Sequence, residues 1–257
     1  MLSKIKITLR PEIPVNMSVN MSSAMHGVLM ELVGHETAEY LHTESLRPYS
    51  QHLEIADDEM IWNVCSLTEF AYEKIVKILM DEGLKEIYLK KHDVKFNIIS
   101  RELTELPVRE LSAGFYRENS DRYVKLRFLT PTAFKQNGKY TFYPDLSCIY
   151  GSLMRRMDFV SLRNGMYDED LLEELTKRSD IVSYNLRTVN YHLEGVRIPA
   201  FIGRITIKIT GAQSLINYVN MLMKFGEFSG LGIKTSLGMG AVKIIEASDK
   251  KNSTHLF

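Results

Sequence analysis

The chain has 257 residues, of which 45% are hydrophobic and 25% charged, a composition typical of a globular protein with its own core. Its 32 Lys and Arg balance its 32 Asp and Glu, so the net charge alone gives no reason to expect a nucleic-acid partner. The sequence has no run of about 18 apolar residues and no signal-peptide pattern at its start. We therefore expect a cytoplasmic protein without a membrane partner.

The charge is unevenly distributed along the chain. Residues 1–110 contain 12 Lys and Arg against 18 Asp and Glu, whereas residues 111–257 contain 20 against 14. A basic half beside an acidic half allows a local surface that binds anions. The two cysteines, Cys65 and Cys148, lie far apart and form no C-x-x-C pair, so we expect buried free thiols and neither a zinc site nor a disulfide framework.

Residues 1–110 predict a first βαββαβ unit. Alternating Ile and Lys predict a half-buried strand over residues 4–9. A helix over residues 22–33 is expected to begin at a cap by Ser22 or Ser23 and to end at Gly34. The remaining expected elements are a short helix over 37–42, strands over 53–56 and 60–67, a helix over 69–80, and strands over 87–89 and 94–99.

Residues 111–257 predict the same order of elements with a larger insert. The pattern indicates a strand over 123–129, a loop over 130–134, helices over 145–160 and 168–177, strands over 182–193 and 201–209, a helix over 211–225 and a closing strand over 241–245. Each half is therefore expected to be a ferredoxin-like unit of the α+β class, with an antiparallel sheet and a boundary between the halves at residue 110.

A glycine-rich segment, residues 226–242, is the most informative part of the sequence. Its glycines can bring backbone N–H groups close to an anion, and Lys234 and Thr235 add a charge and a hydroxyl. A nucleotide-binding P-loop requires G-x-x-x-x-G-K-[ST] between a strand and a following helix. Here Ile233 separates Gly232 from Lys234, and the segment follows a helix, so an ATP site is excluded.

The segment from Gly230 to Gly240 reads G-x-G-x-K-T-x-x-G-x-G. This pattern resembles the C-terminal signature of the CRISPR-associated endoribonucleases that process repeat RNA, within the superfamily of repeat-associated mysterious proteins. Further similar segments, in the family's order, are residues 25–29, 38–42, 128–134, 138–140, 144–145 and 152–156. The resemblance covers nearly the whole chain.

The resemblance implies two tandem ferredoxin-like folds and cleavage of CRISPR precursor transcripts within each repeat to give guide RNAs. It also implies a reaction without metal or cofactor, in which the 2′-OH attacks and leaves a 2′,3′-cyclic phosphate and a 5′-hydroxyl. The implied partner is CRISPR repeat RNA. Other subunits of a CRISPR complex and a second copy of the chain are possible further partners.

Such a reaction needs a base, an acid and a cation, and histidine suits either proton role. His42 matches the family's usual catalytic histidine, and Arg47 matches a position that often holds Lys and would stabilise the phosphorane. Tyr49 could orient the phosphate or assist proton transfer. Where some family members place a tyrosine, this chain has Met30. The second proton-transfer group is therefore left open between His26 and Tyr49.

RNA binding is expected mainly in the second half. The candidate residues are Gly230, Gly232, Lys234, Thr235, Gly238 and Gly240 of the glycine-rich segment, and Arg155 and Arg156 of a helix. Phe134, Tyr140 and Tyr143 could stack on bases. Two alternatives stay open: a subunit that binds repeat RNA without cutting it, and a small-molecule enzyme on a ferredoxin-like scaffold.

Overall fold

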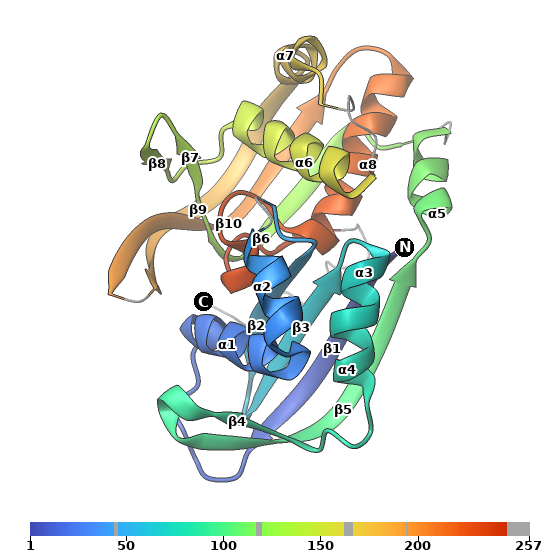
Figure 1. Ribbon diagram of the computed structural model, residues 1–257. Helices are drawn as coiled ribbons and strands as arrows, with labels where there is room; N and C mark the ends of the chain where they lie inside the picture. The colour runs from blue at the N-terminus through green and yellow to red at the C-terminus, as the bar shows by residue number, and fades with distance from the viewer. Residues whose placement is uncertain (44–45, 117–119, 162–166, 194, 246–257) are drawn as a thin grey trace.

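The computed structural model describes residues 1–43, 46–116, 120–161, 167–193 and 195–245. Two antiparallel sheets form its framework, and Figure 1 shows that the helices of each half cover one side of its sheet. None of the helices in these ranges is long and apolar enough to cross a membrane.

The first half builds a five-stranded sheet with the order β2-β3-β1-β5-β4. Its elements are β1 (Leu2–Pro11), η1 (Val19–Met21), α1 (Ser22–Val33), α2 (His35–Thr43), β2 (Tyr49–Ala56), β3 (Glu59–Ser66), α3 (Glu69–Ala71), the π-helical η2 (Tyr72–Val76), α4 (Lys77–Met80), β4 (Glu86–Leu89), η3 (Lys90–His92) and β5 (Val94–Leu106). The inner strand β1 pairs Ile5 with Val64 of β3 and with Leu103 of β5. With β4 as an added edge strand, the connectivity is that of a ferredoxin-like unit.

The second half builds a four-stranded sheet with the order β11-β6-β10-β9. Its elements are α5 (Val108–Ala113), η4 (Gly114–Tyr116), β6 (Tyr123–Thr132), β7 (Phe134–Gln136), β8 (Lys139–Thr141), α6 (Leu146–Ser161), α7 (Glu169–Lys177), β9 (Ser179–Leu193), β10 (Val196–Ile209), α8 (Gln213–Ser229), η5 (Thr235–Leu237) and β11 (Val242–Ile244). The order of β6, α6, β9, β10, α8 and β11 repeats that of the first half. The expected tandem ferredoxin-like fold is confirmed.

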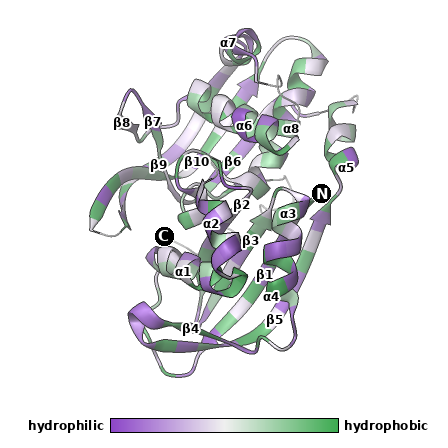
Figure 2. Cartoon of the chain, in the orientation of Figure 1, coloured by the Kyte–Doolittle hydropathy of each residue, from purple (hydrophilic) through white to green (hydrophobic). Residues whose placement is uncertain are grey.

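Each sheet has a hydrophobic core under its helices. Hydrophobic and hydrophilic residues alternate along β1 (Figure 2), which buries Ile5, Ile7 and Leu9 completely against the helices. The core of the second half extends into the first, because Leu2 and Cys65 pack in the same cluster as Phe225. Both cysteines are buried free thiols, as expected. The boundary between the halves at residue 110 stays a prediction.

Two local expectations were wrong. Helix α1 has the predicted bounds, but its N-cap is Met21, and the Ser22 hydroxyl donates to the Val19 carbonyl inside the preceding turn. The expected loop over residues 130–134 is mostly extended, since β6 continues to Thr132 and β7 begins at Phe134. The strand continues because the amide of Leu129 donates to Ala241 and the Pro131 carbonyl accepts from Gly240, partners that are distant in sequence.

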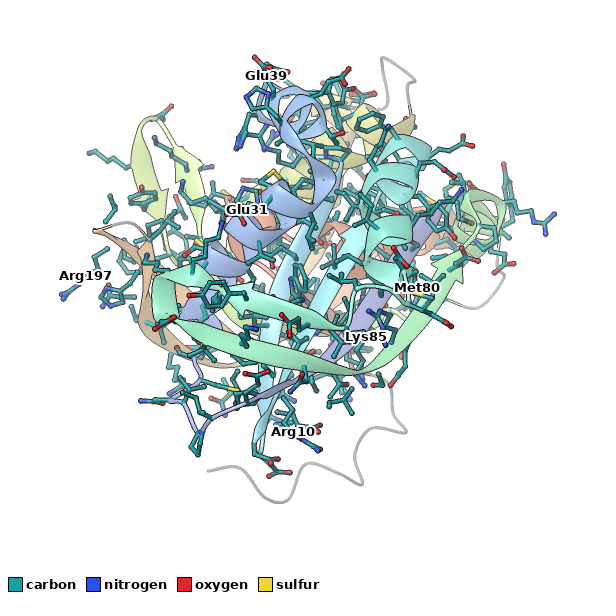
Figure 3. The ribbon with its side chains drawn as sticks, turned by 60° about the horizontal axis from the view of Figure 1, so that its bottom comes forward. Arg10, Glu31, Glu39, Met80, Lys85 and Arg197 are labelled. Atoms are coloured by element: carbon teal, nitrogen blue, oxygen red, sulfur yellow. The ribbon has the colours of Figure 1, made fainter. Side chains whose placement is uncertain are left out.

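The residues between α8 and β11, numbers 230–241, form the glycine-rich loop, drawn toward the red end of the colour bar in Figure 1. The loop lies where the halves meet, because its η5 turn packs against α1 and β2 of the first half. A small third cluster, which includes Met239 and Tyr191, fixes it to the β9–β10 hairpin. Figure 3 shows Arg197 at the outer end of that hairpin, pointing away from the molecule.

Candidate active site at the junction of the halves

Three rings from three elements meet beside the glycine-rich loop. His26 comes from α1, His42 from the end of α2 and Tyr49 from the start of β2. The centroid of the His26 ring lies 6.1 Å from that of His42 and 6.2 Å from that of Tyr49. Helices α1 and α2 follow one another directly, with Glu31 near the end of α1 and Glu39 on α2 (Figure 3), because Gly34 at φ 79° ends the first helix.

Exposure of the three rings to solvent differs in a way that separates their roles. His42 is exposed, His26 is half-buried, and Tyr49 is fully buried at 0% exposure. A substrate on the surface can therefore touch His42 and His26 directly. Tyr49 is shielded from solvent, so in this structure it cannot touch a molecule on the surface, and its expected role in catalysis stays a prediction.

A hydrogen bond fixes the buried side of His26. The Tyr49 Oη and His26 Nδ1 are 3.1 Å apart, and Ser236 of the glycine-rich loop lies close to the Tyr49 hydroxyl. Burial raises the pKa of Tyr49 above its usual range, so the phenol keeps its proton. With the Tyr49 O–H donating to Nδ1, the neutral imidazole of His26 carries its proton on Nε2, on the side away from Tyr49.

Positive charge also surrounds His26. Burial is the largest cause that lowers its pKa to about 4, followed by the charges of His42 and Arg47. His26 is therefore neutral at physiological pH. Arg47 is half-buried and close enough to act electrostatically on both His26 and Tyr49. The structure thus brings together all four side chains that the sequence singled out for catalysis.

Gln51 supports this group and was not identified from the sequence. Its amide donates to the carbonyl oxygens of Ser22 at 2.7 Å and Ser236 at 3.0 Å, and its oxygen accepts from the Trp62 indole at 2.7 Å. Gln51 therefore ties α1, the glycine-rich loop and β3 together next to Tyr49. Nothing in the local sequence distinguishes it, since its partners are brought together only by the fold.

The glycines of the loop are used mainly for close packing. A Cβ on Gly238 would lie 2.2 Å from the Cβ of Ser22, and one on Gly240 would lie 1.9 Å from the Leu231 carbonyl oxygen. Several loop amides are already bonded inside the protein: Gly232 donates to Ser152 Oγ, and Gly240 donates to Pro131. The expected contacts of Gly230, Gly232, Gly238 and Gly240 with RNA phosphates stay a prediction.

The other residues expected to bind RNA differ in their surroundings. Lys234 is exposed, in a left-handed conformation at φ 55°, whereas Thr235 is buried. Arg155 is exposed and lies over the Tyr167 ring at 5.3 Å, and Arg156 is only 7% exposed. Among the aromatic candidates, Phe134 is buried and Tyr143 is exposed; Tyr140 is half-buried.

A row of cations on the second sheet was missed. Arg127 of β6 lies in register between Lys243 of β11 and Arg204 of β10, on the sheet face opposite to the buried Leu126 and Phe128. Arg127 and Arg204 make no ion pair within the described ranges. Like charges directly opposite one another are unfavourable. The alternation of basic residues in each strand was visible in the sequence, but their alignment required the strand register.

Across the described ranges, no group of three or more His, Cys, Asp or Glu side chains is placed to hold a metal ion. The fold and the site together define a protein of two tandem ferredoxin-like halves with a histidine pair at their junction. The family model of the CRISPR-associated endoribonuclease Cas6 matches residues 126–242.

Two curated relatives carry the same description. A CRISPR-associated endoribonuclease Cas6 of Streptococcus thermophilus is 36% identical over 224 residues, covering 87% of this chain and 91% of the relative. One of Mycobacterium tuberculosis is 30% identical over 246 residues, covering 95% of this chain and 78% of the relative. The chain belongs to the family of CRISPR-associated endoribonucleases Cas6, as the sequence motifs predicted.

The solved structure of a Cas6 product complex has the same fold. It superposes with a TM-score of 0.79 at 21% sequence identity, covering 95% of this chain and 99% of that one. With 95% of the chain covered, this agreement extends over both halves.

Proposed function

We propose that this protein is a metal-independent endoribonuclease that cleaves CRISPR repeat RNA within precursor transcripts. The observation that carries the proposal is the meeting of His26, His42, Arg47 and Tyr49 beside the glycine-rich loop. Relatives of 30% identity or more are Cas6 endoribonucleases, and similar folds have been solved as Cas6 product and substrate mimic complexes.

The geometry supports a division of roles in attack by the 2′-OH. His42 is the exposed imidazole and carries the proton. As the base it takes the proton of the attacking 2′-OH, and as the imidazolium it returns that proton to the 5′ oxygen when the P–O bond to it breaks. His26 stays neutral, and its Nε2–H donates a hydrogen bond to the phosphate as negative charge builds up there. Arg47 supplies the positive charge, and Tyr49 is a positioning residue that fixes the tautomer of His26.

This division is our proposed answer to the question that the sequence left open between His26 and Tyr49. The second imidazole next to His42 is His26, but its lowered pKa makes it a poor acid, because it holds no spare proton at neutral pH. It acts instead as a neutral hydrogen-bond donor. The products expected from this arrangement are a 2′,3′-cyclic phosphate and a 5′-hydroxyl.

RNA binding uses the exposed Lys234 and the cations of the second half. Arg127 and Arg204 lack carboxylate partners among the described residues, so binding a polyanion relieves their mutual repulsion. Affinity for RNA should therefore fall steeply as salt rises.

A single-turnover cleavage assay with end-labelled repeat RNA in excess EDTA tests the proposal. We expect cutting at one position to continue in EDTA, with a cyclic phosphate on the upstream product, and to stop when the scissile nucleotide carries 2′-hydrogen. Tight binding without product would identify the chain as a non-catalytic RNA-binding subunit. Loss of activity in EDTA that is restored by a metal would contradict the proposed chemistry.

A further inference from the structure

A cavity of about 320 Å³ lies between the glycine-rich loop, α6 and the β7–β8 hairpin. Residues that line it include Leu46, Phe134, Lys135, Arg155, Arg156 and Gly232. Its volume is near the lower end of the roughly 300–1,000 Å³ typical of small-ligand sites. It therefore suits a group about the size of one nucleotide.

The Arg156 guanidinium in the wall of this cavity is incompletely paired. The side chain is only 7% exposed, and its Nη2 donates to the Gly232 carbonyl at 3.1 Å. Its Nη1 is buried and has no hydrogen-bond partner. Burial lowers the pKa of Arg156 only to about 10, so the group is charged at neutral pH. A buried cation with unsatisfied donors is unfavourable unless an anion complements it.

The rest of the wall adds positive charge. Arg155 donates to the Tyr167 hydroxyl at 3.3 Å and lies over its ring, which holds the guanidinium beside the opening. Lys135 contributes a further exposed cation. Among the described residues that line the cavity there is no Asp or Glu. Arg pairs with phosphate through several parallel hydrogen bonds, so the wall is suited to a phosphate group.

The cavity also lies close to the histidine pair. Gly232 belongs to its wall, and Ser236, four residues along the same loop, lies close to Tyr49 and accepts from Gln51 through its carbonyl. Four residues of chain span at most about 14 Å. Leu46 lines the cavity as well and follows His42 closely in the chain. A strand of RNA at the histidines therefore needs only a few nucleotides to reach the cavity.

We propose that this cavity, the Arg156 pocket, binds one phosphate of the RNA together with its nucleotide, a few positions along the strand from the scissile link. Arg155 and Arg156 donate to the phosphate oxygens, and the apolar wall of Leu46 and Phe134 contacts the sugar or the base. The inference rests on the proposed function, and it names a second place where the protein holds the strand.

Fluorescence anisotropy with repeat RNA carrying 2′-hydrogen at the scissile nucleotide tests the pocket without cleavage. Arg156→Gln keeps a donor for Gly232 and removes the charge, so we expect about tenfold weaker binding. The log–log salt slope should become shallower by about one. Gln136→Glu places a carboxylate at an exposed position in the wall, without changing buried packing, and should weaken binding about fivefold.

Two matched variants control for net charge. Lys177→Gln removes a positive charge and Asn190→Asp adds a negative one at exposed positions of the same half, outside the pocket, and both should stay within about twofold of the wild type. If both pocket variants kept the wild-type RNA affinity and salt slope, the proposed role of the pocket would be overturned. The proposal would also be overturned if Arg156→Gln weakened binding and lowered the melting temperature while Gln136→Glu bound normally. That result would show that Arg156 stabilises the fold and does not bind RNA.

Two further outcomes separate the pocket from the proposed function. If the wild-type protein does not bind repeat RNA, the proposed function itself fails. If inorganic phosphate raises the melting temperature of the wild type but not of Arg156→Gln, and neither pocket variant changes RNA affinity, the pocket takes free phosphate. That result would overturn its role in RNA binding.

Discussion

The hydroxyl of Tyr49 lies 3.1 Å from Nδ1 of His26, and the planes of the two rings are only 14° apart. Tyr49 is fully buried and keeps its proton, so in the proposed function its hydroxyl donates to Nδ1 and leaves the Nε2–H of His26 for the phosphate.

Tyr49→Phe should slow single-turnover cleavage about tenfold, since the loss of one hydrogen bond frees His26 to take the other tautomer. Imidazole ¹⁵N shifts should show the change in tautomer, a readout that a general loss of packing would not produce. Tyr88→Phe removes an exposed hydroxyl bonded to Asp93 and serves as the control. Unchanged tautomer and rate would contradict the role of Tyr49.

His42→Ala should reduce cleavage by about 10²–10⁴-fold, the usual contribution of proton transfer, while RNA affinity stays within a few-fold. His35→Ala is a matched control, because His35 lies on the same helix and its side chain is 94% exposed. Rates under single-turnover conditions and affinities by anisotropy separate the two effects. If the His42→Ala protein cut at the wild-type rate, His42 would have no part in cleavage.

Stability should fall in mild acid because of His26. At neutral pH its ring is uncharged in the folded chain and mostly uncharged in the unfolded chain. As pH falls through about 6.5, the unfolded chain takes up a proton that the folded chain accepts only near pH 4. The free energy of unfolding should therefore drop across this window, by at most about 3 kcal/mol.

Urea unfolding at about pH 7 and pH 5 measures this drop. In His26→Gln the pH dependence should be smaller than in the wild type, whereas His35→Gln, at an exposed ring, should leave it unchanged. Equal slopes for wild type and His26→Gln would show that another group is responsible.

Gly238→Ala should destabilise the protein by roughly 3–5 kcal/mol, because the added methyl would overlap Ser22 at a φ of 101°. Gly138→Ala is the matched control: Gly138 also has a positive φ, of 78°, but its Cβ would meet no atom within 4 Å. The control should lose only about 1–2 kcal/mol from backbone strain. Thermal unfolding that shows equal losses would indicate that α1 and the loop are not closely packed.

Lys234→Ala should mainly weaken RNA binding, by a few-fold, and make its salt slope shallower by about one. The Lys234 side chain is exposed, so the change should leave the melting temperature within a degree or two. Lys91→Ala, an exposed lysine of the first half, should change neither affinity nor slope. A large loss of stability would instead assign Lys234 a structural role.

Sequence periodicity predicted the fold well where neighbouring residues decide the structure. Helix α1 has the predicted bounds because its apolar face and Gly34 are local signals. The extension of β6 through Pro131 was missed, since its partner is the glycine-rich loop more than a hundred residues away. The hairpin of β7 and β8 was missed in the same region, where short strands leave little periodicity.

The candidate catalytic residues were found from the family motif, but their division of roles was not. Burial of Tyr49 and the surroundings of His26 depend on packing across α1, β2 and the loop. The surroundings of Arg156 could not be predicted either, because in the sequence it is only one of two adjacent cations on a helix. Only the fold shows that its guanidinium lies under Gly232, beside a cavity.

Two residues of the glycine-rich loop lie at different functional places. Ser236 lies close to Tyr49, which contacts His26, and Gly232 lines the Arg156 pocket. Within this loop Gly232, Gly238 and Gly240 pack closely against Ala133, Ser22 and Leu231. Under the two proposals made above, the loop sets the distance between the pocket that holds the RNA and the histidine pair that cleaves it. A residue inserted between Gly232 and Ser236 would be expected to move the position of the cut along the RNA, and the end of the product would record the change.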